Sequence, residues 1–262
     1  MRLTVCLLIV VAALSGCVHE LNKSVGSISN YTDPVTGMKF IYVVGGCYQM
    51  GDTFGDGQDN EKPVHEVCLD SFYIGKYEVT QEQWVKIMGS NPEDKKDSAF
   101  YRCRHDCPVE RVTWYEVQDF ISKLNVQTDG KYRLPTEAQW EYACRSGGKH
   151  EKYSGGNDPS EYAWYEANVN DRTGIIGLKK PNGLEIYDMS GNAWEWVLDM
   201  YNKDAYSSHA HNNPVYKGPG VGHVIRGGAW YVSRQYVRCA LRYTDAPPNK
   251  GENVGFRLLR TN

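Results

Sequence analysis

An apolar run near the N-terminus, followed much later by six cysteines, is the feature that most constrains this chain. Arg2 supplies a positive charge, and the twelve residues 3–14 are mostly apolar. That run is too short to cross a bilayer as a helix but is typical of the core of a signal peptide. An exported chain reaches an oxidising compartment, where an even number of cysteines favours disulfides. The six cysteines beyond the leader are Cys47, Cys68, Cys103, Cys107, Cys144 and Cys239.

The leader ends in Leu14-Ser15-Gly16-Cys17, and small residues before a cysteine resemble a lipobox. On that interpretation residues 1–16 are the signal peptide, Cys17 carries a lipid, residues 17–34 form a polar tether, and residues 35–262 form the domain. An ordinary cleaved signal peptide and an anchor helix are the alternatives. The expected location is the bacterial cell envelope, with the lipid-anchored domain on its periplasmic or cell-surface face. Val18 is not aspartate, which favours the outer membrane in a diderm.

Composition limits the class of protein. About 230 residues remain beyond the leader and tether, enough for one large domain or two small ones. The chain is 41% hydrophobic and 12% aromatic with 26 glycines, which is typical of a globular, turn-rich protein. Its net charge is −3 and no run of basic residues exceeds two, so a nucleic-acid partner is not expected.

Three capping boxes predict three helices, opened by Thr80, Thr113 and Thr136. In the third helix, Trp140, Ala143 and Cys144 are expected on one side. Strand patterns run through residues 38–50 and 64–79, which could pair antiparallel around the acidic loop 52–61, expected to be solvated. Closing strands are expected at 223–231 and 253–260, and residues 148–222 are expected to be mostly loop. The pattern indicates an α+β domain.

Seven short motifs occur in order between about residue 36 and residue 260. Together they resemble the formylglycine-generating enzyme (sulfatase-modifying factor) family. This resemblance implies a single compact, loop-rich α+β domain with a C-type-lectin-like core. The matching segments are residues 45–51, 63–67, 77–80, 132–143, 191–196, 226–228 and 254–257.

Enzymes of that family oxidise a sulfatase cysteine to formylglycine with copper and oxygen, using two cysteines that bind Cu(I) shortly after a Gly-Gly-Ser motif. Thiolates are soft ligands that suit Cu(I). Here the serine position is Ala229, the first cysteine position is Val232, and the second is lost near Val237. No catalytic residue is therefore assigned, and copper is not expected.

The resemblance also suggests how the cysteines pair. Cys144 and Cys239 match a structural pair of the family. Cys47 and Cys68 lie on the two strand patterns, so a bridge between them is expected, and Cys103 and Cys107 are close enough for a local bridge. The Cys103–Cys107 segment also offers a metal-binding alternative through its histidine. Spacing alone leaves fifteen pairings open.

The resemblance further implies a calcium site. Its ligands are the side chain of Asp188, the backbone carbonyls of Gly191 and Ala193, and the carboxylate of Glu195. Calcium takes six to eight hard oxygen ligands, which a turn with two carboxylates and free carbonyls can supply. The alternative is a metal-free turn held by the surrounding tryptophans.

Three functions follow from these observations. The favoured hypothesis is a membrane-anchored, non-catalytic binding or scaffold module of the cell envelope with an unidentified protein or carbohydrate ligand. A formylglycine-generating oxidase is the second. The third is a C-type-lectin-like surface protein diversified by a retroelement, with Tyr243 and Thr244 adding to its ligand face. The expected ligand face comprises Trp194, Tyr231, Val232, Ser233, Arg234, Gln235 and Tyr236.

Overall fold

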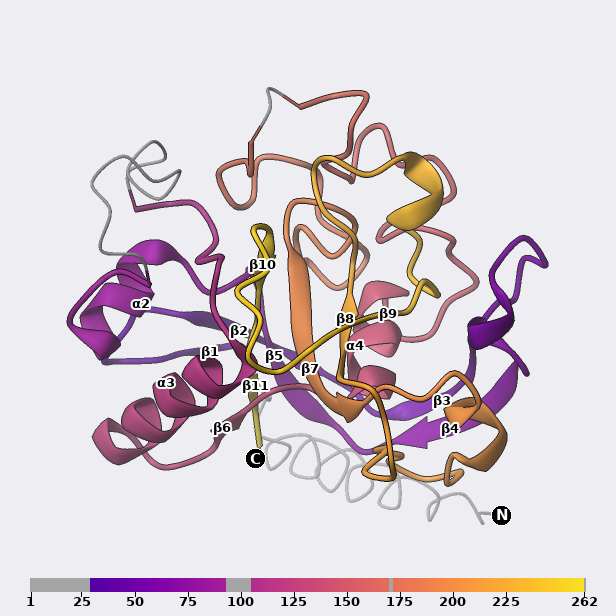
Figure 1. Cartoon of the computed structure of the whole chain (residues 1–262), viewed down its shortest axis with the longest axis horizontal. Coiled ribbons are helices and arrows are strands. Elements are labelled where there is room, and N and C mark those ends of the chain that lie inside the picture. The colour runs from indigo at the N-terminus through magenta and orange to yellow at the C-terminus, as the bar shows by residue number, and fades with distance from the viewer. Residues whose placement is uncertain (1–28, 93–104, 170–171, 262) are drawn as a thin grey trace, which may run out of the picture.

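The computed structural model describes residues 29–92, 105–169 and 172–261. Helices and strands are mixed along this part of the chain and joined by long irregular segments (Figure 1), which confirms the predicted loop-rich α+β fold. The helices are α2 (Gln81–Met88), α3 (Trp114–Gln127) and α4 (Glu137–Cys144), with the 3-10 turns η1 (Asp59–Glu61), η3 (Ala205–Ser208) and η4 (Arg234–Tyr236). The strands are β1 (Tyr31–Thr32), β2 (Lys39–Val43), β3 (Gly46–Met50), β4 (His65–Leu69), β5 (Phe72–Gly75), β6 (Tyr132–Arg133), β7 (Trp194–Met200), β8 (His223–Arg226), β9 (Tyr243–Asp245), β10 (Val254–Gly255) and β11 (Leu259–Arg260).

The strands form three sheets. The first has the order β1-β2-β5-β11-β6 and is antiparallel throughout. The second has the order β10-β7-β8-β9, in which β10 runs parallel to β7. The third is the antiparallel pair β3–β4, which lies on the opposite side of the molecule from α2 and α3 (Figure 1). The two predicted strand runs therefore do pair, but as two separate ladders, β3 with β4 and β2 with β5.

The N-terminal boundary of the fold lies earlier than predicted. Tyr31 and Thr32 pair with β2, and the carboxylate of Asp33 is buried, where it accepts a 2.7 Å hydrogen bond from the Tyr132 hydroxyl. Residues 31–34 thus belong to the domain and not to a tether. The leader and Cys17 lie outside the described residues. Among the residues that are described, no helix is both long and apolar enough to cross a membrane.

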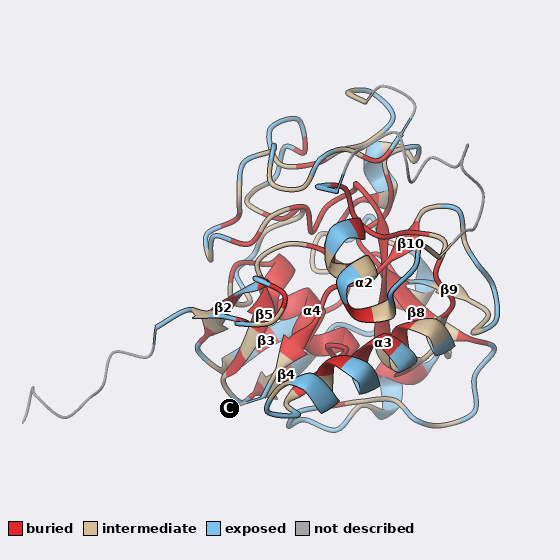
Figure 2. Cartoon of the chain, turned by 90° about the vertical axis from the view of Figure 1, so that its left-hand side faces the viewer, coloured by how far each residue is buried: buried red, intermediate tan, exposed pale blue. Residues whose placement is uncertain are grey.

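All three predicted helices form, and their capping boxes are the reason. Each N-cap threonine side chain accepts a hydrogen bond from the backbone N–H three residues on, and the side chain at that later position accepts one from the threonine N–H. Helix α3 buries one face and exposes the other (Figure 2). Its Phe120 stacks on Trp84 of α2 with the ring centroids 5.4 Å apart, which joins the two helices in one core cluster.

Helix α4 differs from the prediction, because all of its residues are buried instead of one side (Figure 2). Two of them are glutamates, and each pairs with an arginine from a distant part of the chain. Glu137 accepts two hydrogen bonds from the Arg242 guanidinium, at 2.6 and 2.9 Å. Glu141 accepts one from Arg226 at 2.6 Å and one from Arg145 at 3.0 Å. Burial alone raises the pKa of Glu137, but the neighbouring guanidinium groups outweigh it and hold that pKa below its ordinary value.

Two further sequence expectations are corrected. The acidic loop 52–61 is not simply solvated, because Asp52 and Glu61 are buried and Glu61 forms a two-bond ion pair with Arg238 at 2.7 Å. The region 148–222 is mostly irregular but contains β7, a seven-residue strand at the centre of the second sheet. Its burial on both faces removes the alternation that normally reveals a strand.

The predicted disulfides are confirmed where the structure describes both partners. Cys47 is bonded to Cys68 across β3 and β4, and Cys144 at the end of α4 is bonded to Cys239. Cys107 is also disulfide-bonded. Cys103, its predicted partner, lies outside the described residues.

Candidate functional site

An aromatic pocket of about 830 Å³ opens beside the second sheet. Four predicted ligand-face residues line it: Trp194, Tyr231, Val232 and Tyr236. Ser233, Arg234 and Gln235 do not, and the last two are exposed on the surface. The remaining lining residues are Gln58, Ile225, Trp230, Tyr243, Thr244, Asp245, Gly251, Glu252, Asn253 and Val254.

The neighbouring strands position the inner wall of this pocket. Trp194 is the first residue of β7 and is 5% exposed, and Tyr243 begins β9 and is 54% exposed. Their rings lie 5.5 Å apart at 31°. The buried tryptophan thus supports a tyrosine that reaches solvent, which gives the pocket a fixed aromatic surface.

The outer wall comes from the segment that follows the Arg-Gly-Gly motif. Gly228 has φ of 78°, and a Cβ there would lie 2.4 Å from the Tyr236 carbonyl oxygen, so only glycine allows the chain to turn at this point. The turn presents Trp230, whose indole N–H donates to Asn253 Oδ1 at 2.8 Å, and Tyr231, which is 48% exposed. The sequence missed Trp230 as a site residue, although it lies within the segment between two matching motifs.

Acidic side chains stand at the edge of the pocket. Asp245 Oδ1 accepts hydrogen bonds from the Ala246 N–H and the Asn249 amide, both at 2.8 Å. Glu252 lies 3.6 Å from the Arg111 guanidinium and is largely exposed. The pocket therefore combines flat apolar surfaces with carboxylate and amide groups, a composition suited to binding a ligand with both apolar and polar faces.

Comparison with known proteins identifies the family to which this fold belongs. Residues 28–262 match the family described as the sulfatase-modifying factor enzyme 1-like domain. The chain belongs to this family.

Similar members carry different names. Chaperone protein LppX of Paenibacillus barcinonensis is 29% identical over 97% of this chain and 97% of that protein. The formylglycine-generating enzyme of Streptomyces coelicolor is 26% identical, covering 81% of this chain and 86% of the enzyme. The solved structure of Treponema denticola variable protein 1 has a TM-score of 0.75 and 29% identity, covering 89% of this chain and 99% of that one. The family thus includes both named oxidases and proteins with other names.

Of the three positions at which the resemblance expects the catalytic serine and cysteines, one lines the aromatic pocket. Ala229 is fully buried in the main core cluster, and Val232 lines the pocket. Val237 is fully buried against Tyr153 and Ala163. The described residues that line the pocket include no cysteine and no histidine.

The motif expected to hold calcium lies in a buried, acid-rich part of this sulfatase-modifying factor domain. Asp188 accepts a 2.6 Å hydrogen bond from the Gly177 N–H through Oδ2, while its Oδ1 is buried without a partner. Glu195 accepts from the Arg257 guanidinium with both oxygens, at 2.6 and 2.7 Å, and from the Trp140 indole at 2.7 Å. Of the two predicted side-chain ligands, Asp188 therefore has the unused oxygen.

A third buried acid, Glu78, adds to this charge. It accepts hydrogen bonds from the Asn192 amide at 2.7 Å and the Ala193 N–H at 3.1 Å. Burial, together with the charges of Asp188 and Glu195, raises the pKa of Glu78 well above its ordinary value. Burial likewise raises the pKa of Asp188 to about 6. Three acids share this buried region with Arg257, and Lys179 also acts on Asp188. Burial therefore favours the protonated forms of Glu78 and Asp188, and a divalent cation there would favour their charged forms.

Proposed function

We propose that this domain is a non-catalytic binding module of the bacterial cell envelope that recognises a protein or carbohydrate ligand in its aromatic pocket. The observation that carries the proposal is the composition of the pocket wall. Five aromatic rings from four segments converge there: Trp194, Trp230, Tyr231, Tyr236 and Tyr243. Flat rings beside carboxylate and amide groups supply large contact area at low cost in side-chain entropy.

The residues at the catalytic positions support a role other than oxidation. Cu(I) requires soft ligands, and Val232 and Val237 offer none. Similarity to the named formylglycine-generating enzymes supports common ancestry of the scaffold, but a shared fold does not carry the chemistry with it.

One form of the proposal has an observation in its favour. The chain is similar over 89% of its length to a protein whose name calls it variable. The expected ligand face overlaps the pocket wall at Tyr231, Val232 and Tyr236, and Tyr231 is about half exposed. Substitutions at such positions would change which ligand the domain binds without disturbing the core, as the retroelement hypothesis requires.

The location belongs to the proposal as well. A lipid on Cys17 is expected to tether the domain to a membrane of the cell envelope, on its periplasmic or cell-surface face and on the outer membrane in a diderm. The short apolar leader and the lipobox-like ending support this location.

The test of the binding proposal uses the exported chain on a glycan array and on a peptide array. We expect binding to a subset of probes that falls at least tenfold in Tyr243→Ala, because this ring forms the exposed part of the aromatic wall. Tyr115→Ala is the matched control, since Tyr115 is a similarly exposed tyrosine on α3, away from the pocket wall. Binding that survives Tyr243→Ala on both arrays, or is lost equally in the control, contradicts a role for this pocket.

A second assay tests the alternative enzyme function. A Cys-x-Pro-x-Arg peptide incubated with the chain, copper and oxygen is expected to show no aldehyde by mass spectrometry, with the Streptomyces coelicolor formylglycine-generating enzyme as the positive control. Formation of formylglycine would replace the binding proposal with the oxidase function.

We also propose that calcium binds at Asp188, Glu195 and the carbonyls of Gly191 and Ala193. The buried Asp188 Oδ1 without a partner and the neighbouring buried acids support this site. At a hundredfold excess over its Kd, calcium stabilises a folded protein by about 2.7 kcal/mol. For a domain of this size that predicts a Tm increase of roughly 5–10 °C at pH 7.5.

The pH dependence follows from the raised pKa of Asp188. The folded protein holds a proton that the unfolded chain releases between about pH 4 and the folded pKa of about 6. Without calcium, the stability linked to this proton is present below that window and is lost as the pH rises through it. Calcium should therefore raise Tm above pH 6 and lose its effect below it, as differential scanning calorimetry can show. An equal calcium shift in Asp188→Asn, or none in the wild type, would contradict the site.

A further inference from the structure

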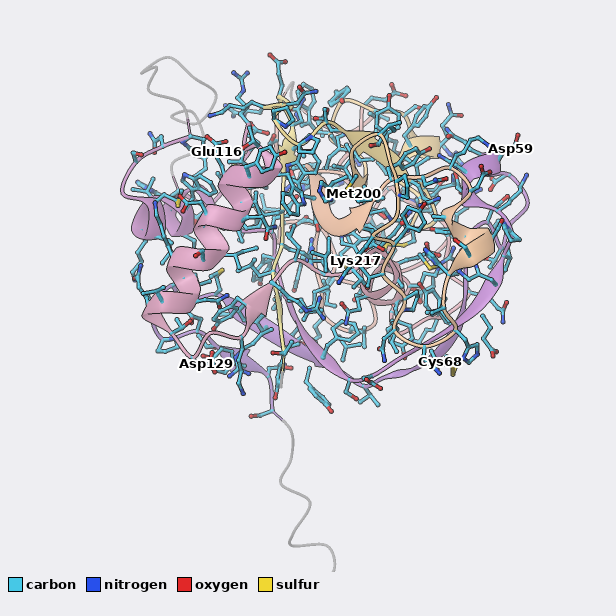
Figure 3. All side chains as sticks on the ribbon, turned by 60° about the horizontal axis from the view of Figure 1, so that its bottom comes forward. Asp59, Cys68, Glu116, Asp129, Met200 and Lys217 are labelled. Carbon is cyan, nitrogen blue, oxygen red and sulfur yellow. A yellow bond between two sulfur atoms is a disulfide. The ribbon has the colours of Figure 1, made fainter. Side chains whose placement is uncertain are left out.

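The β3–β4 pair carries a disulfide on its exposed face. Side chains alternate along both strands, and Tyr48, Met50, Val67 and Leu69 on the inner face are buried. Cys47 and Cys68 face each other directly across the pair, and Gln49 and Glu66 form the next pair on the same outward side. Cys47 is exposed and Cys68 is half-buried. Figure 3 shows Cys68 at the edge of the molecule. The Cys144–Cys239 disulfide, by contrast, is fully buried.

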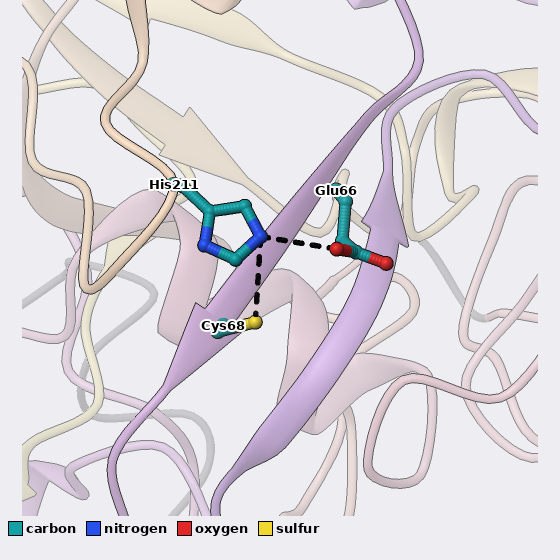
Figure 4. A group of neighbouring side chains, drawn as sticks. All are labelled: Glu66, Cys68 and His211. Atoms are coloured by element: carbon teal, nitrogen blue, oxygen red, sulfur yellow. Dashed lines mark hydrogen bonds and ion pairs between the residues drawn. The ribbon is translucent and has the colours of Figure 1, made fainter.

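A histidine is held against one sulfur of this exposed disulfide. The Cys68 N–H donates to the His211 carbonyl and the Asn213 N–H donates to the Cys68 carbonyl, both at 2.8 Å, so segment 211–213 runs alongside β4. This pairing places His211 Nε2 3.7 Å from Cys68 Sγ and 3.0 Å from Glu66 Oε1 (Figure 4). The position of the imidazole is therefore fixed by backbone pairing and by a carboxylate.

The surroundings of His211 favour its protonated form. Nε2 faces the Glu66 carboxylate, and Nδ1 lies 3.1 Å from Asn212 Oδ1, so an imidazolium can donate from both nitrogens. Among the described residues, Glu66 is the charged group in contact with this ring. The hydrogen bond to Glu66 raises the pKa of His211 above its ordinary value. A group that can act as an acid is thus placed 3.7 Å from the Cys68 sulfur.

The other sulfur borders a cavity of about 770 Å³. Cys47, Gln49 and Glu66 line one side of it, and Phe54 and His150, whose rings stack 4.2 Å apart, line another. This cavity shares no lining residue with the aromatic pocket. It gives a peptide or small thiol access to the Cys47 sulfur.

This group of side chains also resembles a metal site, since the ligand atoms of Glu66, Cys68 and His211 all lie within 4.8 Å of one another. Metals, however, bind the thiolate, and the Cys68 sulfur is committed to a disulfide. The chemistry available to a disulfide beside an acid is exchange with a thiol, in which a more stable leaving thiolate leaves faster.

We propose that Cys47–Cys68 is a thiol–disulfide exchange site for an external dithiol, with His211 as the acid and Glu66 as the residue that positions it. The thiolate of the dithiol attacks Cys47 Sγ and forms a mixed disulfide. The Cys47–Cys68 bond breaks, its electron pair passes to Cys68 Sγ, and His211 Nε2 gives that sulfur a proton. The second thiol of the partner then loses its proton and its sulfur displaces Cys47 Sγ, which leaves as a thiolate and takes up a proton. His211 regains its proton from water, the partner leaves as a disulfide, and the chain holds two thiols. This activity is independent of ligand binding in the aromatic pocket.

The test measures reduction of each disulfide in the full exported chain by limiting dithiothreitol at pH 7, using differential alkylation and mass spectrometry. We expect Cys47 and Cys68 to become alkylated while Cys144 and Cys239 stay protected. Because accessibility alone explains that contrast, His211→Asn is decisive, and we expect it to slow reduction of Cys47–Cys68 about tenfold. His105→Asn, the same change at an exposed histidine on another loop, should match the wild type. An unchanged rate in His211→Asn overturns the proposal.

The role of Glu66 has its own readout. The ratio of the wild-type rate to the His211→Asn rate isolates the contribution of the imidazolium, and it should fall toward one as the pH rises through the His211 pKa. In Glu66→Gln that fall should occur at lower pH, because the carboxylate that favours the imidazolium is gone. Glu66→Asp should restore part of the shift. If the ratio in Glu66→Gln follows the wild-type pH profile, Glu66 does not position the acid.

Discussion

Replacing Glu137 by glutamine is expected to lower the free energy of unfolding by about 3–5 kcal/mol, a decrease in Tm on the order of 10 °C. The substitution keeps the shape of the side chain but removes the charge that faces Arg242 at 2.6 Å and Arg226 at 3.4 Å. All three side chains are fully buried, so Arg242 would lose its paired carboxylate and Arg226 would keep only Glu141, in a place that water does not reach. Thermal or urea unfolding followed by circular dichroism measures the loss.

The control for Glu137→Gln is the same substitution at Glu161. Its partner Lys180 lies 2.8 Å away, but both side chains are more than half exposed, so the pair should contribute less than about 1 kcal/mol. A loss in Glu137→Gln as small as that in Glu161→Gln would mean that water reaches the buried arginines, contrary to the structure.

Removing the Cys144–Cys239 disulfide should have an effect of similar size. The bond closes a loop with a sequence separation of 95, and in the chain-entropy account its loss costs about 4–5 kcal/mol. The double variant Cys144→Ala/Cys239→Ala is therefore expected to unfold at much lower urea concentration than the wild type, with the midpoint measured by fluorescence or circular dichroism.

The exposed disulfide provides the comparison. Cys47 and Cys68 are separated by 21 residues, so the double variant Cys47→Ala/Cys68→Ala should lose about 3 kcal/mol. It should lose less than the buried pair also because neither sulfur fills the core. A larger loss of stability in Cys47→Ala/Cys68→Ala than in Cys144→Ala/Cys239→Ala would show that loop length and burial do not determine how much each disulfide stabilises the fold.

The sequence predicts the helices well because their signals are local. Each capping box joins residues only three apart, and Val117, Phe120, Ile121 and Leu124 repeat at helical spacing along α3. The family motifs also have structural roles that explain their residue types. In the Gly-Phe-Arg motif, a Cβ on Gly255 would lie 2.2 Å from the Val109 carbonyl oxygen. Phe256 is buried, and Arg257 pairs with Glu195.

The remaining features depend on partners that are far apart in the sequence. Glu61 and Arg238 are separated by 177 residues, and Glu137 and Arg242 by 105, so no local pattern reveals that these charges are buried together. The same applies to β7, whose glutamate and aspartate look solvent-facing until their distant partners are known. The aromatic pocket includes residues of β7, β9 and the segment after β8, and only the folded chain brings Trp230 and Tyr243 into one pocket.

The position of β11 in the first sheet limits the order in which this chain can fold as it is made. Leu259 and Arg260 lie between β5 and β6, in the same sheet as Tyr31 and Thr32. A chain that leaves a ribosome or a translocation channel N-terminus first cannot complete this sheet until residue 260 has emerged. Contacts of such long sequence separation form late and slowly. The topology thus delays closure of this sheet until Leu259 and Arg260 are free to pair with β5 and β6.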